Sequence, residues 1–511
     1  MQKKNLIKGT LILAAAGIIA KIFGFFFRIP IIYMIGEEGI GLYQLTYPLY
    51  TFLLAIAAGI PTALSKMISE RMALHKRGEA NKIFKIALIT MALFGGISSC
   101  VLIVFADYII EACSWSKEVY YSLIGISLAP FFTCLLSVFR GYFQGLQNML
   151  PTAVSQVLEQ LVRVIVGVSL VYILLPRGIS ISAGGAAFGA TAGAFAALMW
   201  IVYCYIKNKI KFNKEEKCKS SIDIFSEILK IAIPISIGQA IGSIMTLIDS
   251  MMVTGLLKSS GFTDKTATIL YGQLTGKAFV LINVPLTLSI AIAQNTVPAI
   301  SEAFAGRDRV KLKHNIKISY KLAMILALPC CAGLYTLSRP ILGLVFQGMS
   351  DGWELMQILS VAALFIIIAQ TSTSILNGMG KTIMPVAAMI VGSGIKILIS
   401  IIFIPMPQYN IKAAAYGTLF AYLAVAIIDI ILVIKYTKVY IDIHEVFILP
   451  VVSTIIMIIS VVASYGKIYN LTRSGNLSTV STIFIGAFVY FLMLFLSGAV
   501  KISDLKNKIK K

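Results

Sequence analysis

Long apolar runs, separated by short polar stretches, follow one another along the whole chain of 511 residues. Each run has roughly 20 residues, which as an α-helix spans the ~30 Å hydrocarbon core of a bilayer. Continuous runs of this length differ from the alternating strands of a membrane β-barrel. Hydrophobic residues make up 58% of the chain and charged residues 13%, so it has too little polar surface for a water-soluble domain. The runs lie near residues 10–34, 45–65, 86–106, 120–139, 152–175, 183–206, 231–256, 270–297, 318–338, 355–376, 384–405, 412–434, 446–465 and 479–500. The sequence predicts an all-α polytopic membrane protein with about 14 transmembrane helices.

The first run follows three lysines, Lys3, Lys4 and Lys8, as the apolar part of a signal peptide would. It continues as apolar sequence to Ile35 and is followed by many further runs. An uncleaved first helix is therefore expected rather than a signal peptide.

The lysines and arginines give the predicted orientation. With the N-terminus in the cytoplasm, 31 of the 44 basic residues fall in the inside segments and 9 in the outside loops. Cytoplasmic loops are enriched in Lys and Arg, so this bias predicts an inner-membrane protein with both termini cytoplasmic. The net charge of +22 is explained by these loops, which face anionic lipid. Nucleic-acid binding is not expected, because no soluble region is long enough to form a binding domain.

Motifs for metals, cofactors and catalysis are missing from the sequence. The seven cysteines lie mostly inside runs and form no disulfide framework, and the three histidines stand alone in loops. The segment GQLTGKA at 272–278 lacks P-loop spacing, and the GKT-ending segment at 375–382 begins with Ile375 instead of glycine. No HExxH motif is present. The sequence therefore predicts no metal, no cofactor and no enzymatic activity.

Two weak echoes suggest an internal repeat. At an offset of 236, Arg71 matches Arg307 and Lys85 matches Lys321, each pair in a cytoplasmic link. At an offset of 234, Pro151 of GLQNMLPTA matches a proline of GKTIMPVAA. Copies six runs apart have the same orientation, which is typical of transporters with parallel halves. The predicted domains are a six-helix lobe at 1–206, a basic linker at 207–230, a second six-helix lobe at 231–434, and two extra helices with a basic tail at 435–511.

Ionisable residues inside the runs are candidate site residues, because such groups in a bilayer normally face a cavity or a partner. In the first run Lys21 and Arg28 share one helical face with two glycines. Snorkelling of Arg28 to the outer interface is the alternative. In the seventh run Asp249 lies on the same face as a Gly238–Gly242 GxxxG spacing, which more often packs helices than binds ligands. Asp249 is expected to serve as a salt-bridge or gating partner.

The fifth run carries Gln156, Glu159 and Arg163. Glu159 and Arg163 have the i,i+4 spacing of a helical ion pair. Two interpretations stay open: a self-neutralising structural pair, or a cavity wall in which the arginine exchanges its partner for an anionic substrate.

The eighth run contributes Lys277 and Asn283, and the eleventh contributes Lys396, which follows two glycines. Buried cations therefore outnumber the buried carboxylates Glu159, Asp249 and Asp429. A cavity with excess positive charge favours an anion, and arginine is suited to phosphate oxygens.

Several motifs in order resemble the stage V sporulation protein B family, and the resemblance covers essentially the whole chain. They are FGFFFRIPIIYMIGEEGIGLYQLTYPLY, AAGIPTALSKMISE, FRGYFQG, SQVLEQLVRV, ILYGQLTGKAF, VPAISE and LNGMGK. This family is a polysaccharide-transporter branch of the superfamily that includes lipid II flippases and multidrug MATE antiporters.

The resemblance implies two six-helix lobes working by alternating access and a role in moving lipid II outward for spore cortex synthesis. It also implies a lipid-linked substrate of the undecaprenyl diphosphate type, membrane lipid as a partner, and cell-wall synthesis enzymes as further partners. In lipid II flippases a basic first helix lines the central cavity, and Lys21 and Arg28 occupy the comparable stretch, with Arg28 about one residue late. The last two helices form a groove for the prenyl tail in that family.

From these expectations we derive a hypothesis in which Arg28, Arg163, Lys277 and Lys396 bind a diphosphate-linked sugar head group. Three alternatives stay open at this point. A cation-coupled multidrug exporter would favour buried carboxylates. A membrane glycosyltransferase would need a large outer loop with catalytic carboxylates. A scaffold for cell-wall enzymes would not need buried charge.

Overall fold

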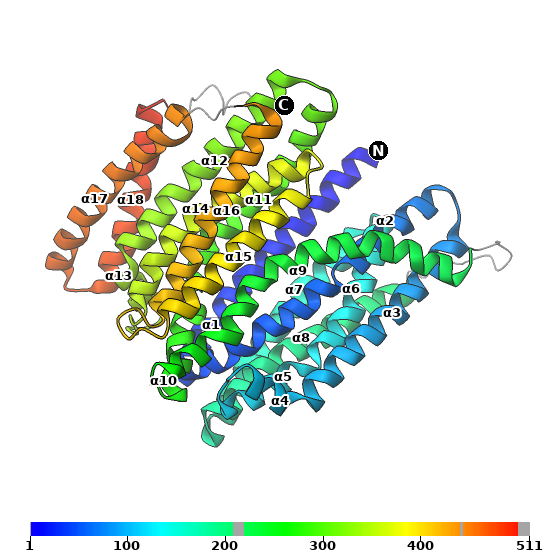
Figure 1. Ribbon diagram of the computed structural model, residues 1–511, viewed down its shortest axis with the longest axis horizontal. Coiled ribbons are helices and arrows are strands. Elements are labelled where there is room, and N and C mark those ends of the chain that lie inside the picture. Colours follow the sequence, from blue (N-terminus) through cyan, green and yellow to red (C-terminus); the bar gives the residue numbers. More distant parts are fainter. Residues whose placement is uncertain (1, 208–218, 440–442, 499–511) are drawn as a thin grey trace. The chain divides into compact units, whose positions relative to one another are not determined.

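The computed structural model describes residues 2–207, 219–439 and 443–498, and every regular element in these ranges is a helix. The chain divides into two compact units, residues 1–272 and 273–511. Figure 1 shows the helices of both units in the colours of the sequence.

The first unit contains α1 (Gln2–Ala57), α2 (Gly59–Ala73), α3 (Arg77–Val104), α4 (Ala106–Ala112), η1 (Lys117–Val119), α5 (Tyr120–Ser127), α6 (Ala129–Gly145), α7 (Met149–Leu174), η2 (Leu175–Arg177), α8 (Ile179–Lys207), α9 (Ser221–Ser259) and α10 (Asp264–Gly272).

The second unit contains the π-helix η3 (Gln273–Ala278), α11 (Phe279–Ala305), α12 (Arg309–Thr336), α13 (Ser338–Val345), α14 (Trp353–Gly378), α15 (Ile383–Phe403), α16 (Lys412–Thr437), the π-helix η4 (His444–Ile448), α17 (Leu449–Thr472) and α18 (Gly475–Leu496).

Within the described residues, 12 helices are long and apolar enough to cross a membrane, or 13 if a bent pair in α9 is one span. One of the 12 is a 59-residue stretch, Ala15–Ala73. At ~1.5 Å per residue it is long enough for two crossings. Gly36, with φ +65°, breaks it between the runs predicted at 10–34 and 45–65. The predicted all-α polytopic membrane fold is confirmed.

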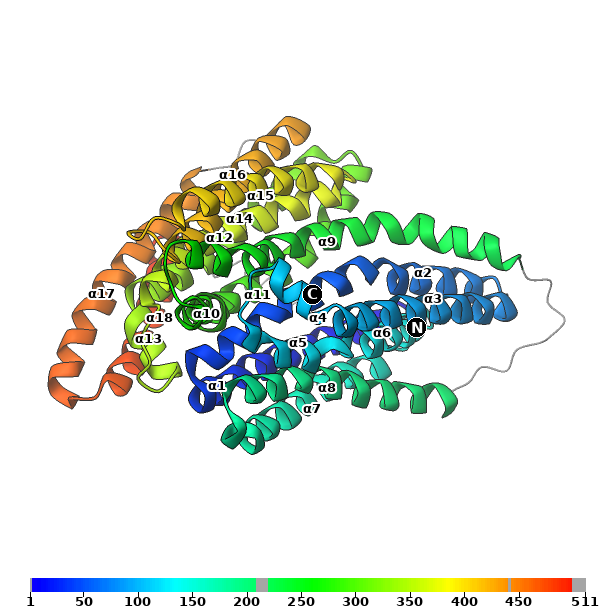
Figure 2. The same cartoon turned by 60° about the horizontal axis from the view of Figure 1, so that its bottom comes forward.

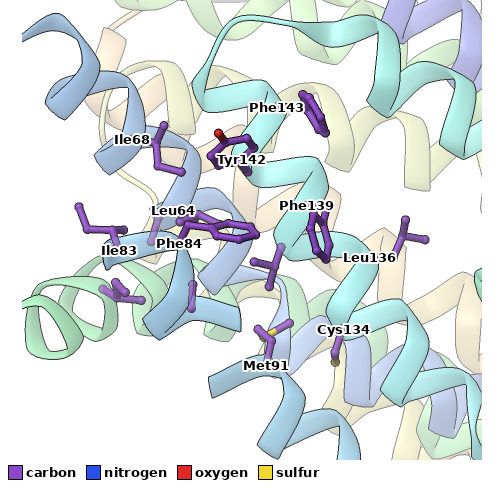
Figure 3. Packing of buried hydrophobic residues seen from close by; sticks show 14 of the residues in the cluster. Leu64, Ile68, Ile83, Phe84, Met91, Cys134, Leu136, Phe139, Tyr142 and Phe143 are labelled. Atoms are coloured by element: carbon purple, nitrogen blue, oxygen red, sulfur yellow. The ribbon is translucent and has the colours of Figure 1, made fainter. Parts of the chain in front are cut away.

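Buried apolar side chains of α2, α3 and α6 form a core in the first unit, which continues onto α8 and α9. Figure 3 shows Leu64 and Ile68 of α2 beside Phe84 of α3 and Tyr142 of α6. The rings of Phe84 and Tyr142 lie 4.9 Å apart. A second core in the second unit joins α11, α12, α14 and α16.

The long helix α9, which contains the seventh predicted run, packs on α2 and α3 and so belongs to the first unit (Figure 2). The Gly59 amide donates to Ser236 Oγ over 3.1 Å. Arg71 of α2 also pairs with Glu79 of α3 at 3.3 Å and with Glu227 of α9 at 3.1 Å. The division by packing thus falls after residue 272, later than the predicted start of a second lobe at 231. The six-plus-six repeat stays a prediction.

One helix contact has the same form in both units. A Cβ on Gly145 of α6 would lie 2.9 Å from Ile68 Cβ and 2.8 Å from a backbone carbonyl oxygen of α2. A Cβ on Gly378 of α14 would lie 2.9 Å from Ile300 Cβ and 2.8 Å from a backbone carbonyl oxygen of α11. Only glycine permits these approaches.

The last two helices, α17 and α18, pack against each other and against α12 (Figure 1). Tyr490 of α18 donates to the Ile325 carbonyl over 2.7 Å. Their other faces are exposed and apolar, as at Ile459 and Phe488. The predicted prenyl groove stays a prediction.

Candidate functional site

The guanidinium of Arg163, on α7, lies inside the first unit with 7% of the residue exposed. Its Cζ stands 5.2 Å from the centre of the Tyr47 ring, within cation–π distance. Tyr43, Tyr47 and Tyr50 follow an i, i+4, i+7 pattern on α1, and their rings form a chain with centroids 5.7 and 5.8 Å apart. An aromatic face of α1 therefore holds the buried cation.

Arg28, half-buried on α1, contributes to the same place, because its charge and that of Arg163 both act on Tyr43 and Tyr47. Its Nη1 donates to the Gly24 carbonyl of the preceding helical turn over 3.0 Å. This bond keeps the guanidinium beside α1. The structure thus brings together two of the predicted cations of the first unit.

Glu159 pairs with Arg140. The i,i+4 spacing instead predicts Arg163 as its partner. Arg140 Nη2 donates to Glu159 Oε2 over 2.8 Å, and Arg140 Nε donates to Ser155 Oγ over 2.9 Å. The prediction of a self-neutralising pair is wrong because α6 places a second arginine beside Glu159. Arg140 lies on a neighbouring helix, so its pairing with Glu159 could not be inferred from spacing along α7.

Small residues of α8 fix the position of α7. A Cβ on Gly189 would lie 2.8 Å from the Arg163 carbonyl oxygen, and a Cβ on Gly193 would lie 2.3 Å from the Glu159 carbonyl oxygen. With Gly185 they form a GxxxGxxxG stripe. The close approach leaves α7 little freedom to rotate or slide, so Arg163 faces α1. The stripe is visible in the sequence and was missed there.

Several polar atoms at this site have no hydrogen-bond partner within the described residues. They include Nε and Nη2 of Arg163, Nε of Arg28, and Oε1 of the half-buried Gln156. Buried polar groups are normally satisfied, and exceptions mark places where a ligand or water belongs. Two guanidinium groups with free N–H donors in an apolar setting can bind the oxygens of an anion.

The other candidates of the first unit lie elsewhere. Lys21 is exposed on α1. Asp249 of α9 is 6% exposed, and its charge acts on Tyr271. A Cβ on Gly238 or Gly242 would meet no atom of the described residues within 4 Å, and the packing face of these two glycines stays a prediction.

In the second unit Lys277 is fully buried on the π-helix η3, with Nζ 5.8 Å from the centre of the Phe346 ring. Lys396, on α15, is 2% exposed, and Asn283, on α11, is exposed. Asp429 of α16 is fully buried and accepts a 3.0 Å bond from Thr373 Oγ1. Among its described residues, the second unit therefore contains two buried cations and one buried carboxylate.

No group of three or more His, Cys, Asp or Glu side chains in the described part of the chain could hold a metal ion.

Comparison with known proteins shows the family and the fold. The family model described as "Polysaccharide biosynthesis protein" matches residues 6–304. The chain belongs to the polysaccharide biosynthesis protein family. A second model, MatE, matches residues 234–402.

Two relatives from Bacillus subtilis (strain 168) show which members of the family the chain resembles. Stage V sporulation protein B is 33% identical over 334 residues, which are 64% of this chain and 64% of that protein. The matched part is thus less than two thirds of that relative. Lipid II flippase MurJ is 28% identical over 438 residues, 81% of this chain and 80% of that protein. The predicted resemblance to the stage V sporulation protein B family is confirmed.

Solved structures agree on the fold. The inward closed conformation of the lipid II flippase MurJ has a TM-score of 0.73 at 17% identity, covering 94% of this chain and 98% of that chain. An inward-facing MATE family transporter has a TM-score of 0.70 at 16% identity, covering 82% and 94%. The family member described here is therefore a multi-pass membrane protein with the fold seen in a lipid II flippase and a MATE transporter.

Proposed function

We propose that the chain is a flippase that moves a lipid-linked anionic saccharide precursor, lipid II for spore cortex peptidoglycan, from the inner to the outer leaflet by alternating access. The observation that carries the proposal is the buried Arg163 guanidinium, whose Nε and Nη2 have no partner within the described residues. The carboxylate nearest in sequence, Glu159, is held by Arg140. A diphosphate would supply the missing acceptors.

In this proposal Arg28 and Arg163 bind the diphosphate, with Gln156 beside them, while the prenyl chain stays in lipid. Lys277 and Lys396 supply buried positive charge in the second unit. Outward movement of a negative head group is favoured by a negative cell interior, by about 2.3 kcal/mol per charge per 100 mV. Of the two Bacillus relatives, one is named as a lipid II flippase and the other as a sporulation protein, which supports the proposal.

A cation-coupled exporter is the second candidate. The MatE match over residues 234–402 and the fully buried Asp429 carboxylate favour it. Such an exporter would need Asp429 to bind a proton or a cation, and would need no anion at Arg163.

The test is the exposure of lipid II at the outer surface of cells depleted of their other lipid II flippases. Wild type is expected to expose it, and Arg163→Ala and Lys277→Ala to reduce exposure by about tenfold or more, as loss of a charged hydrogen-bonding partner does. Arg163→Lys, which keeps the charge and loses the planar fork, is expected to lie between them. Lys66→Ala, at an exposed position (61% side-chain exposure), serves as a matched control. If wild type at normal abundance exposes no lipid II, the cargo assignment is wrong and efflux becomes the leading interpretation.

A further inference from the structure

A cavity lies in the first unit, among α1, α2, α3 and α6. The proposed function does not use it. It encloses about 260 Å³. Its lining consists of Leu54, Ala57, Ala58, Pro61, Thr62, Met91, Thr133, Cys134, Ser137, Arg140, Gly141 and Gln144. By the predicted orientation, these residues lie in the cytoplasmic half of the unit.

One face of α6 supplies the most polar side of this cavity. Ser137, Arg140 and Gln144 follow an i, i+3, i+7 pattern, and the last two belong to the FRGYFQG motif. Arg140 uses Nη2 for Glu159 and Nε for Ser155, and neither bond involves Nη1. The Gln144 carboxamide makes no hydrogen bond within the described residues and is half-buried. Both side chains thus have N–H donors available to a ligand.

Much of the rest of the lining is apolar. Met91 and Cys134, which Figure 3 shows on the neighbouring helices α3 and α6, lie there with Leu54 of α1. Arg140 is the charged residue of the lining, and its partner Glu159 lies outside the lining, 2.8 Å from Nη2. Apolar walls lower the local dielectric constant and strengthen the attraction between Arg140 and an anion.

We propose that this cavity is a separate binding site for a phosphate-bearing group, in which Arg140 exchanges Glu159 for the ligand. Guanidinium groups bind phosphate through two parallel N–H bonds, and a phosphate carries more negative charge than the single Glu159 carboxylate. Ser137 Oγ and Thr62 Oγ1 donate to carbonyls of their own helices at 2.7 and 3.2 Å, and both hydroxyl groups can rotate toward a ligand. The ligand is either a soluble phosphate ester or the phosphate of a lipid head group.

The experiment is equilibrium binding of inorganic diphosphate and of farnesyl diphosphate to the purified full chain in detergent micelles. Arg140→Gln is expected to weaken binding of the probe by about tenfold or more, as loss of one partner of a charged pair does. Glu159→Gln is expected to tighten it about three- to tenfold, because it removes the competing charge and keeps an acceptor for Nη2. Lys66→Gln makes the same charge change on the exposed surface of α2 and is expected to leave binding unchanged.

Gln144→Leu separates binding from folding, because Gln144 belongs to no ion pair. It is expected to weaken binding and to leave thermal unfolding unchanged. Tighter binding of farnesyl diphosphate than of inorganic diphosphate identifies a lipid head group, and equal binding identifies a soluble phosphate. Absence of binding by both probes, or weaker binding in Glu159→Gln, would overturn the proposal. Because the Arg28–Arg163 site would bind the same probes, the Arg140, Glu159 and Gln144 variants are compared in an Arg163→Ala background. Binding that Arg140→Gln weakens there belongs to this cavity, whereas the flippase assignment is decided by the lipid II assay.

Discussion

The two units use the same helix contact but treat charge differently beside it. Gly145 meets Ile68 in the first unit as Gly378 meets Ile300 in the second. Five residues before each glycine stand Arg140 and Thr373 respectively. Both side chains donate to a carboxylate, Arg140 to Glu159 over 2.8 Å and Thr373 to Asp429 over 3.0 Å.

The two units differ in which buried charge is left without a partner of opposite charge. In the first unit an arginine neutralises the carboxylate, and a second arginine, Arg163, is left without an anion. In the second unit the fully buried Asp429 has a hydroxyl group as its partner, and its Oδ1 has none within the described residues. The packing is alike, but the carboxylate beside Gly145 is paired with an arginine, whereas the carboxylate beside Gly378 is paired with a hydroxyl group.

The largest expected effect tests the neutralised pair. Glu159→Ala leaves Arg140 without its partner at a site where both side chains are about 15% exposed. We expect it to lower the free energy of unfolding by about 3–5 kcal/mol, measured by thermal unfolding in detergent. Glu70→Ala, which breaks an exposed pair with Lys66, is expected to cost about 1 kcal/mol or less. Equal losses would show that the Arg140 pair is no more than a surface pair.

Arg163→Met asks whether the first unit holds an uncompensated cation for function rather than for stability. Replacing a buried charge that has no counter-ion by an apolar side chain is expected to leave stability unchanged or raise it by about 1–4 kcal/mol. Lipid II exposure in the same variant is expected to be lost. A destabilised protein would contradict this interpretation and show that the aromatic face of α1 satisfies the guanidinium.

The shared helix contact is tested by two matched variants. Gly145→Ala and Gly378→Ala each force a methyl group against a backbone carbonyl, which is expected to cost about 1–3 kcal/mol of unfolding free energy. We expect the two losses to be similar. Gly238→Ala, where a methyl group meets nothing within 4 Å, is expected to gain about 0.5–1 kcal/mol. Very different losses at the first two positions would break the comparison.

The smallest effect concerns the hydroxyl partner of Asp429. Thr373→Val keeps the shape and removes one hydrogen bond, and we expect a loss of about 1 kcal/mol in unfolding free energy. Thr371→Val is the control, because Thr371 donates to a carbonyl of its own helix. A loss as large as that of Glu159→Ala would mean that the two carboxylates are held equally strongly.

The helical type of the spans could be predicted from the sequence, because apolar length decides what crosses a membrane. The 14 predicted runs compare with 12 or 13 candidate spans in the described residues. The runs at 10–34 and 45–65 were predicted as separate spans, and the structure joins them in one long helix with a break at Gly36. Neither the continuity nor the break has a hydropathy signal.

The charged residues of the site could be named from the sequence, but the ion pair that Glu159 forms could not. Arg28 and Arg163 were named from their places inside apolar runs, and the structure brings them to the same tyrosines. The predicted partner of Glu159 was wrong because contacts between helices decide whether Glu159 meets Arg140 or Arg163. The GxxxGxxxG stripe on α8 fixes these contacts. Spacing along one helix contains no information on the neighbouring helix.

The docking of α9 on α2 has a consequence for how the protein is made. The Gly59 amide bonds to Ser236 and Arg71 pairs with Glu227, and both of these partners are synthesised much later than α2. Domains complete their packing as units during synthesis. The first eight helices must therefore stay unfinished at the translocon until α9 has left the ribosome, and a chaperone or insertase would meet them in that state.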